Sequence, residues 1–97
     1  MNIEDNTTFT QSENIVSCEF EGGSALLDLE KSQYFKLNTS AALVWEWLDT
    51  PITLLGLSKN MLQHFDVEEN VCLSDIKSIL SSFIESGLIE NVNDTSA

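Results

Sequence analysis

The sequence predicts an α+β domain in which a three-stranded antiparallel sheet is followed by three helices, in a winged-helix-like arrangement. Between residues 13 and 37, apolar and polar side chains alternate at every second position, which is the period of a strand with one buried face. From residue 39 onward, apolar side chains recur at helical spacing. Strands that precede helices, rather than alternating with them, favour α+β over a parallel βαβ sheet.

Residues 25–38, ALLDLEKSQYFKLN, predict a hairpin around which the rest of the chain is organised. Its first arm alternates along residues 25–30, and a polar turn follows. In its second arm, residues 33–37, Tyr34 and Lys36 alternate with Phe35 and Leu37. A sheet this small must pack on the helices to be stable. Its last strand is then expected to be an edge with unpaired backbone donors and acceptors.

A strand is also expected within residues 13–21, where Val16, Cys18 and Phe20 alternate with polar residues and are predicted to face inward. Glycines at 22 and 23 indicate the turn that follows it. Residues 1–12 and 93–97 are polar and are expected to be tails, flexible at the N-terminus. The folded domain is therefore predicted to span residues 13–92.

Three helices are predicted from their caps and apolar stripes. Asn38 and Thr39 suit a helix start, and Pro51 favours an end before it. The third helix is expected to begin between residues 68 and 73 and to close at Gly87, with a short extended piece over residues 88–92. The stripes are Ala41, Val44, Trp45 and Leu48; Leu54, Ser58, Met61, Leu62 and Phe65; and Leu73, Ile76, Ile79, Leu80 and Phe83.

The charge of the chain excludes several classes of partner. Its 97 residues include sixteen acidic residues, four lysines and no arginine, for a net charge of −12. Nucleic acids and anionic membranes are bound through cationic side chains, so neither is expected as a partner. No apolar run approaches the ~20 residues that span a bilayer, and we expect a cytoplasmic protein. The acidity fits either simple solubility or docking to a basic partner.

The sequence offers little for catalysis or metal binding. Cys18 and Cys72 are expected to be free thiols, and His64 is the only histidine. These three residues lack the spacing of a metal site, and no partner residue marks a nucleophile. We therefore expect no catalytic residue, no metal and no cofactor. An acyl carrier is a remote alternative, because the Asp-Ser-Leu motif of such carriers is absent and Ser74 precedes Asp75 in the reverse order.

Leu43 and Trp47 lie on a different side of the first predicted helix from its core stripe. They indicate either a helix buried on two sides or an exposed apolar patch on which a protein partner docks.

Three segments, LLDLEKSQYFKLN, AALVWEWLD and DIKSILSSFIESGLIE, together resemble the PqqD-like family of RiPP recognition elements. The resemblance runs from about Ser24 to Glu90 and is strongest to free-standing members from lasso-peptide pathways. An alanine at 41 or 42 stands where many relatives carry glycine. The marks of the resemblance are Leu27-Asp28-Leu29, Tyr34-Phe35, Leu37-Asn38, Trp45 with Leu48, Asp75-Ile76 and Gly87-Leu88.

The resemblance implies a non-catalytic adaptor that binds the leader segment of a ribosomally made precursor peptide. Such domains take the leader as an added strand on their third strand, against their third helix. The implied partners are the precursor peptide and a separate maturation enzyme, of which a leader-cleaving cysteine protease is one candidate. The chain would act as a monomer or a weak edge-strand dimer. The residues this implies are Gln33, Tyr34, Phe35, Lys36 and Leu37 on the strand, and Asp75, Ile76, Lys77, Ile79, Leu80 and Phe83 on the helix.

Lys36 and Lys77 are expected to flank this site, where they could hold acidic groups of a leader. The alternative from another class is a winged-helix-like regulator that acts through protein contacts. An edge strand that no peptide occupies would favour that alternative.

Overall fold

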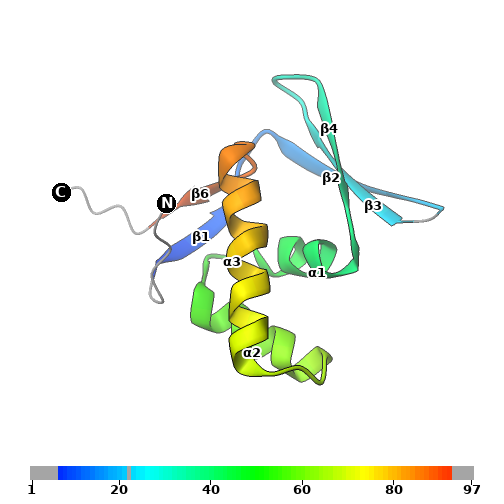
Figure 1. Ribbon diagram of the computed structural model, residues 1–97. Helices are drawn as coiled ribbons and strands as arrows, with labels where there is room; N and C mark the ends of the chain where they lie inside the picture. Colours follow the sequence, from blue (N-terminus) through cyan, green and yellow to red (C-terminus); the bar gives the residue numbers. More distant parts are fainter. Residues whose placement is uncertain (1–6, 22, 93–97) are drawn as a thin grey trace.

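The computed structural model describes residues 7–21 and 23–92, which form two three-stranded antiparallel sheets and three helices (Figure 1). The strands are β1 (Thr8–Gln11), β2 (Ile15–Phe20), β3 (Gly23–Asp28), β4 (Gln33–Leu37), β5 (Ile52–Thr53) and β6 (Ile89–Asn91). The helices are α1 (Thr39–Trp47), α2 (Leu54–His64) and α3 (Glu69–Glu85). The α+β class, the three early strands and the three helices are confirmed, whereas the winged-helix likeness stays a prediction.

The first sheet has the order β2-β3-β4 and is the one that the sequence predicts. Its register pairs Leu26 with Phe35 and Ser17, so these three side chains share one face. Leu26 is fully buried and Phe35 packs on the core, which makes this face the inner one. Hydrophobic burial on one face therefore sets the register of the hairpin.

The opposite face of this sheet overturns one prediction. Val16, Cys18 and Phe20 point away from the core and are exposed, so the prediction that they face inward is wrong. The alternation of β2 distinguishes two faces but not which of them meets the helices. Ile15, at the start of β2, is the residue of this strand that is buried in the core.

A second sheet, of order β5-β1-β6, lies on the other side of α3 in Figure 1. It contains Thr8–Gln11, which the sequence placed in a polar tail; that prediction is wrong for these four residues. Phe9 is buried and pairs with Ile52 and Asn91, so a single aromatic side chain holds β1 in the core. Residues 1–6 and 93–97, the rest of the predicted tails, lie outside the described residues.

Caps set the helix boundaries, and those at Asn38 and Gly87 were predicted from the sequence. The Asn38 Oδ1 accepts from the Ala41 N–H at 2.8 Å and begins α1. Thr53 caps α2, since its Oγ1 accepts from the Gly56 N–H at 3.0 Å. After α3, Gly87 has a φ of 74°, and the Leu88 N–H donates to the Phe83 carbonyl at 2.8 Å. This is the glycine-terminated helix end that the sequence predicts.

One core joins both sheets and all three helices. It contains Trp45, whose ring meets Phe83 of α3 edge-on with centroids 6.0 Å apart. Leu80 and Ile76 of α3 are fully buried in the same cluster. Because α3 contributes to this core along its length, its position relative to the β2-β3-β4 sheet is held by side-chain packing.

Candidate functional site

Strand β4 forms one edge of the β2-β3-β4 sheet, and within the described residues it pairs only with β3. The direction of its backbone groups follows from the hydrogen bonds. The Leu29 N–H donates to the Asn14 carbonyl at 2.9 Å, so residue 29 directs its polar groups toward the β2 side. Polar groups alternate along a strand, so Leu26 directs its own toward β4 and its register partner Phe35. It follows that Tyr34 and Lys36 direct their N–H and C=O groups outward, away from β3.

This open row of donors and acceptors can take a further extended strand. An added strand would form hydrogen bonds with the backbone of Tyr34 and Lys36. Its side chains would alternate between the inner face of the sheet, beside Phe35 and Leu37, and the outer face, beside the side chains of Tyr34 and Lys36.

The predicted site residues of β4 differ in exposure. Gln33, Tyr34 and Lys36 are exposed, and the exposed fraction of Tyr34 is 70%. Phe35 and Leu37 are half-buried and pack on the core from the inner face. Lys36 lies opposite Ala25, on the outer face. Its ammonium group therefore lies on the other side of the sheet from Phe35 and Leu37.

The predicted site residues of α3 divide into core and surface. Ile76, Leu80 and Phe83 are buried in the core cluster and have almost no free surface to offer a ligand. Ile79 is half-buried at the edge of that cluster, whereas Asp75 and Lys77 are exposed. Asp75 and Ile79 are one helical turn apart and share one side of α3, whereas Lys77 lies on the opposite side of the buried stripe, so a ligand lying along one side of the helix meets either the first two or Lys77. The buried three support the helix that such a ligand contacts.

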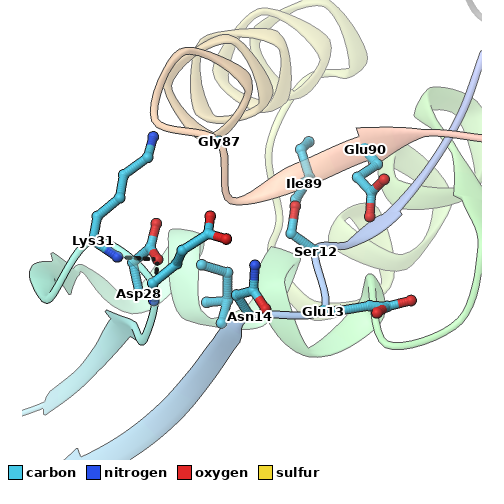
Figure 2. Close-up of a pocket in the computed structure, with 10 residues that line it drawn as sticks. Ser12, Glu13, Asn14, Asp28, Lys31, Gly87, Ile89 and Glu90 are labelled. Carbon is cyan, nitrogen blue, oxygen red and sulfur yellow. Dashed lines mark hydrogen bonds between the residues drawn. The ribbon is translucent and has the colours of Figure 1, made fainter.

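Asp28 explains why the turn before β4 has its shape. Its side chain is buried, and its Oδ1 accepts from the backbone N–H groups of Glu30 and Lys31, each at 3.0 Å (Figure 2). A short acidic side chain is favoured in such turns because it satisfies backbone donors that have no strand partner. Asp28 thus holds the turn that places β4 in register.

Replacing Asp28 with alanine leaves these two N–H groups without their acceptor, and we expect the free energy of unfolding to fall by about 1–3 kcal/mol. Urea denaturation of the wild-type and variant chains measures this difference. Asp28→Asn keeps an oxygen acceptor and should lose less. Equal losses in both variants would show that the negative charge, rather than the hydrogen-bond geometry, holds the turn.

A pocket of about 530 Å³ lies between this turn, the segment that joins β1 to β2, and the end of α3 (Figure 2). Glu13, Asp28, Glu30 and Glu90 contribute carboxylates, and the Lys31 side chain extends toward Gly87. Within residues 7–21 and 23–92, no group of three or more histidines, cysteines or acids is placed to hold a metal ion. The pocket is a polar hollow beside the turn.

The remaining candidates make contacts within the fold. Trp47 is half-buried and stacks on the imidazole of His64, with ring centroids 5.3 Å apart and planes inclined by 21°. Leu43 is half-buried and lines a separate groove near the end of β4. Cys72 is buried beside Ser58, whereas the thiol of Cys18 is exposed; both are free. None of the helices in the described part of the chain is long and apolar enough to cross a membrane.

The fold and the unpaired outer edge of β4 together define a small α+β domain, in which an antiparallel sheet with one open edge accompanies a long helix. The family model for coenzyme PQQ synthesis protein D (PqqD) matches residues 23–89, which run from β3 to the start of β6. The chain belongs to the PqqD family, and the resemblance found in the sequence is confirmed. No curated protein matches the chain significantly.

Three solved structures share the fold. Lasso peptide synthetase B1 complexed with the leader peptide is 24% identical with a TM-score of 0.75, over 84% of this chain and 96% of that one. TbiB1 in complex with the TbiA(beta) leader peptide is 20% identical with a TM-score of 0.76, over 84% and 94%. The PqqD truncation of Methylobacterium extorquens PqqCD, a stand-alone RiPP recognition element, is 18% identical with a TM-score of 0.77, over 92% and 95%.

Proposed function

We propose that this protein is a non-catalytic adaptor that binds the leader segment of a ribosomally made precursor peptide. The leader adds to the outer edge of β4 as a further strand and lies against α3. The observation that carries this proposal is the open edge of β4 in a domain of the PqqD family. Two structures of the same fold are complexes with leader peptides, and a third is a stand-alone recognition element.

The proposed binding site has three parts. The backbone of Tyr34 and Lys36 supplies the hydrogen bonds, which give affinity with little dependence on sequence. Phe35 and Leu37 on the strand, with Ile79 on the helix, supply apolar contacts for those leader side chains that face inward. Gln33, Asp75 and Lys77 are the exposed polar groups at its margins.

Lys36 and Lys77 take separate roles in this proposal. The Lys36 side chain lies on the outer face of the sheet, so it meets leader side chains that point away from the core. Lys77 is exposed on α3, whose buried residues belong to the same core cluster as the inner-face residue Leu26. One acidic side chain of the leader therefore cannot meet both lysines. Contact with both requires two acidic side chains at leader positions that face opposite sides of the sheet.

In this role the adaptor delivers the precursor to a separate maturation enzyme, with a leader-cleaving cysteine protease as one candidate. The step takes place in the cytoplasm, where ribosomally made precursors are available before export. Binding needs no cofactor, because strand addition uses backbone groups and apolar contacts alone.

A fluorescent leader peptide encoded by a precursor gene beside this one tests the proposal. We expect an increase in anisotropy on addition of the protein and a dissociation constant below about 1 μM, which corresponds to about −8.2 kcal/mol. A scrambled peptide of the same composition is the control, because it keeps the charge but loses the pattern of inward-facing side chains. If the leader and the scrambled peptide bind with the same affinity, or if neither binds, specific leader recognition is rejected and the regulator alternative is favoured.

A further inference from the structure

The outer face of the β2-β3-β4 sheet carries exposed apolar side chains on β2, whereas Leu27 of β3 is half-buried and Ala25 is buried. Its register places Val16, Leu27 and Tyr34 in one row across the three strands, and Cys18, Ala25 and Lys36 in the next. Phe20 follows at the end of β2, opposite Gly23. Val16 is 42% exposed and Phe20 47%, and both are large apolar side chains. We call Val16, Cys18 and Phe20 of β2, together with their row partners on β3 and β4, the outer face.

The outer face contributes no residue to the core cluster. The opposite face of the same sheet carries Leu26, Phe35 and Leu37 and makes the contacts with the core. Lys36 is the one charged side chain in the rows of the outer face. Contiguous exposed apolar surface of this kind is uncommon on small proteins unless another molecule covers it.

The size and charge of the surface decide which molecule fits it. Three strands about 4.8 Å apart, each about six residues long at about 3.3 Å per residue, present roughly 300 Å². A stable interface buries about 800 Å² on each partner, so the outer face needs support from its surroundings. The chain as a whole is strongly acidic, and the carboxylate of Glu21 is exposed beside Phe20 in the turn after β2. A second copy, also with a net charge of −12, would be repelled there.

We propose that the outer face docks the maturation enzyme, through an apolar patch on that enzyme bordered by lysine and arginine side chains. This inference rests on the proposed function and adds a second surface to it. The leader occupies the edge at β4, whereas β2 is the opposite edge strand of the same sheet. One small sheet thus holds the leader and the enzyme side by side, which raises the effective concentration of the precursor at the enzyme.

Cys18 provides a direct probe of this surface. It lies in the second row of the outer face, and it is the exposed cysteine of the two, since Cys72 is buried. Alkylation by N-ethylmaleimide, followed by intact mass, therefore reports access to the outer face. We expect the purified maturation enzyme encoded beside the precursor gene to slow alkylation of Cys18 by about tenfold at saturation, whereas the leader peptide alone leaves the rate unchanged.

A double substitution on β2 tests the same surface by affinity. Val16→Thr with Phe20→Thr keeps strand-compatible side chains and should weaken enzyme binding by about tenfold or more, with leader affinity kept within about twofold. The matched control is Leu55→Thr with Val71→Thr, two similarly exposed apolar side chains on α2 and α3. This control should change neither affinity.

The outcomes separate the two proposals. If the enzyme binds without protecting Cys18, or fails to bind, the outer face is not its docking surface, whatever the leader does. If Cys18 is protected on raising the concentration of this protein alone, with a dimer in sedimentation, a second copy occupies the face and the enzyme proposal is overturned. If the wild-type protein does not bind the leader peptide, the proposed function itself is rejected.

Discussion

Replacing Lys36 with proline is expected to weaken leader binding by about tenfold or more, which is about 1.4 kcal/mol, while the domain stays folded. Lys36 directs its N–H outward from the β4 edge, so proline removes a donor that the added strand needs and leaves the bonds to β3 in place. Proline is tolerated on edge strands for this reason. Anisotropy titration with the fluorescent leader measures the change.

Two control substitutions make this result specific to the backbone. Lys36→Ala removes the charge but keeps the N–H, and a loss of similar size in this variant would assign the effect to the ammonium group. Phe35→Pro removes an N–H that points toward β3 and should destabilise the sheet itself. If Lys36→Pro binds the leader as tightly as the wild type, strand addition at β4 is wrong.

Leu80→Ala is expected to lower the free energy of unfolding by about 2–5 kcal/mol. Leu80 is 0% exposed and lies in the core cluster to which both sheets contribute, so truncation leaves a cavity that the neighbours fill incompletely. A domain of this kind has about 5–15 kcal/mol in total, and the loss is a large part of it. Chemical denaturation, followed by the fluorescence of Trp45 and Trp47, measures it.

Leu55→Ala is the matched control, since Leu55 is exposed on α2 and its truncation should change the free energy of unfolding by about 0.5 kcal/mol or less. A small effect for Leu80→Ala would mean that α3 is not anchored in the core as the contacts indicate. The expected loss also has a practical consequence. Reduced leader binding by a Leu80 variant reports the stability of α3, whereas Ile79 and Lys77 are the positions that test contact with the leader.

Local patterns in the sequence were sufficient for most of the fold. The alternation over residues 25–37 predicted β3 and β4, and Asn38, Pro51 and Gly87 predicted where helices begin or end. These features depend on neighbours a few residues away, which is why they can be read from a single sequence. The edge position of β4 followed as well, because the expected sheet ended with that strand.

The second sheet could not be predicted in the same way. Strand β1 has one apolar residue, Phe9, among polar ones, and β5 has two residues in all. Their pairing joins residues 8–11, 52–53 and 89–91, which are distant in sequence. Only the closed core brings these segments together. The apolar Phe9 between threonines is the one local signal that could have indicated β1.

The sequence by its own periodicities thus set the order of the elements, their approximate ends and the edge at β4. Tertiary packing chose which face of the first sheet is buried. Leu26 and Phe35 fit against the helices, and so Val16, Cys18 and Phe20 had to face outward. The physical reason is that a period of two residues defines two faces equally well, and only contact with the rest of the core distinguishes them.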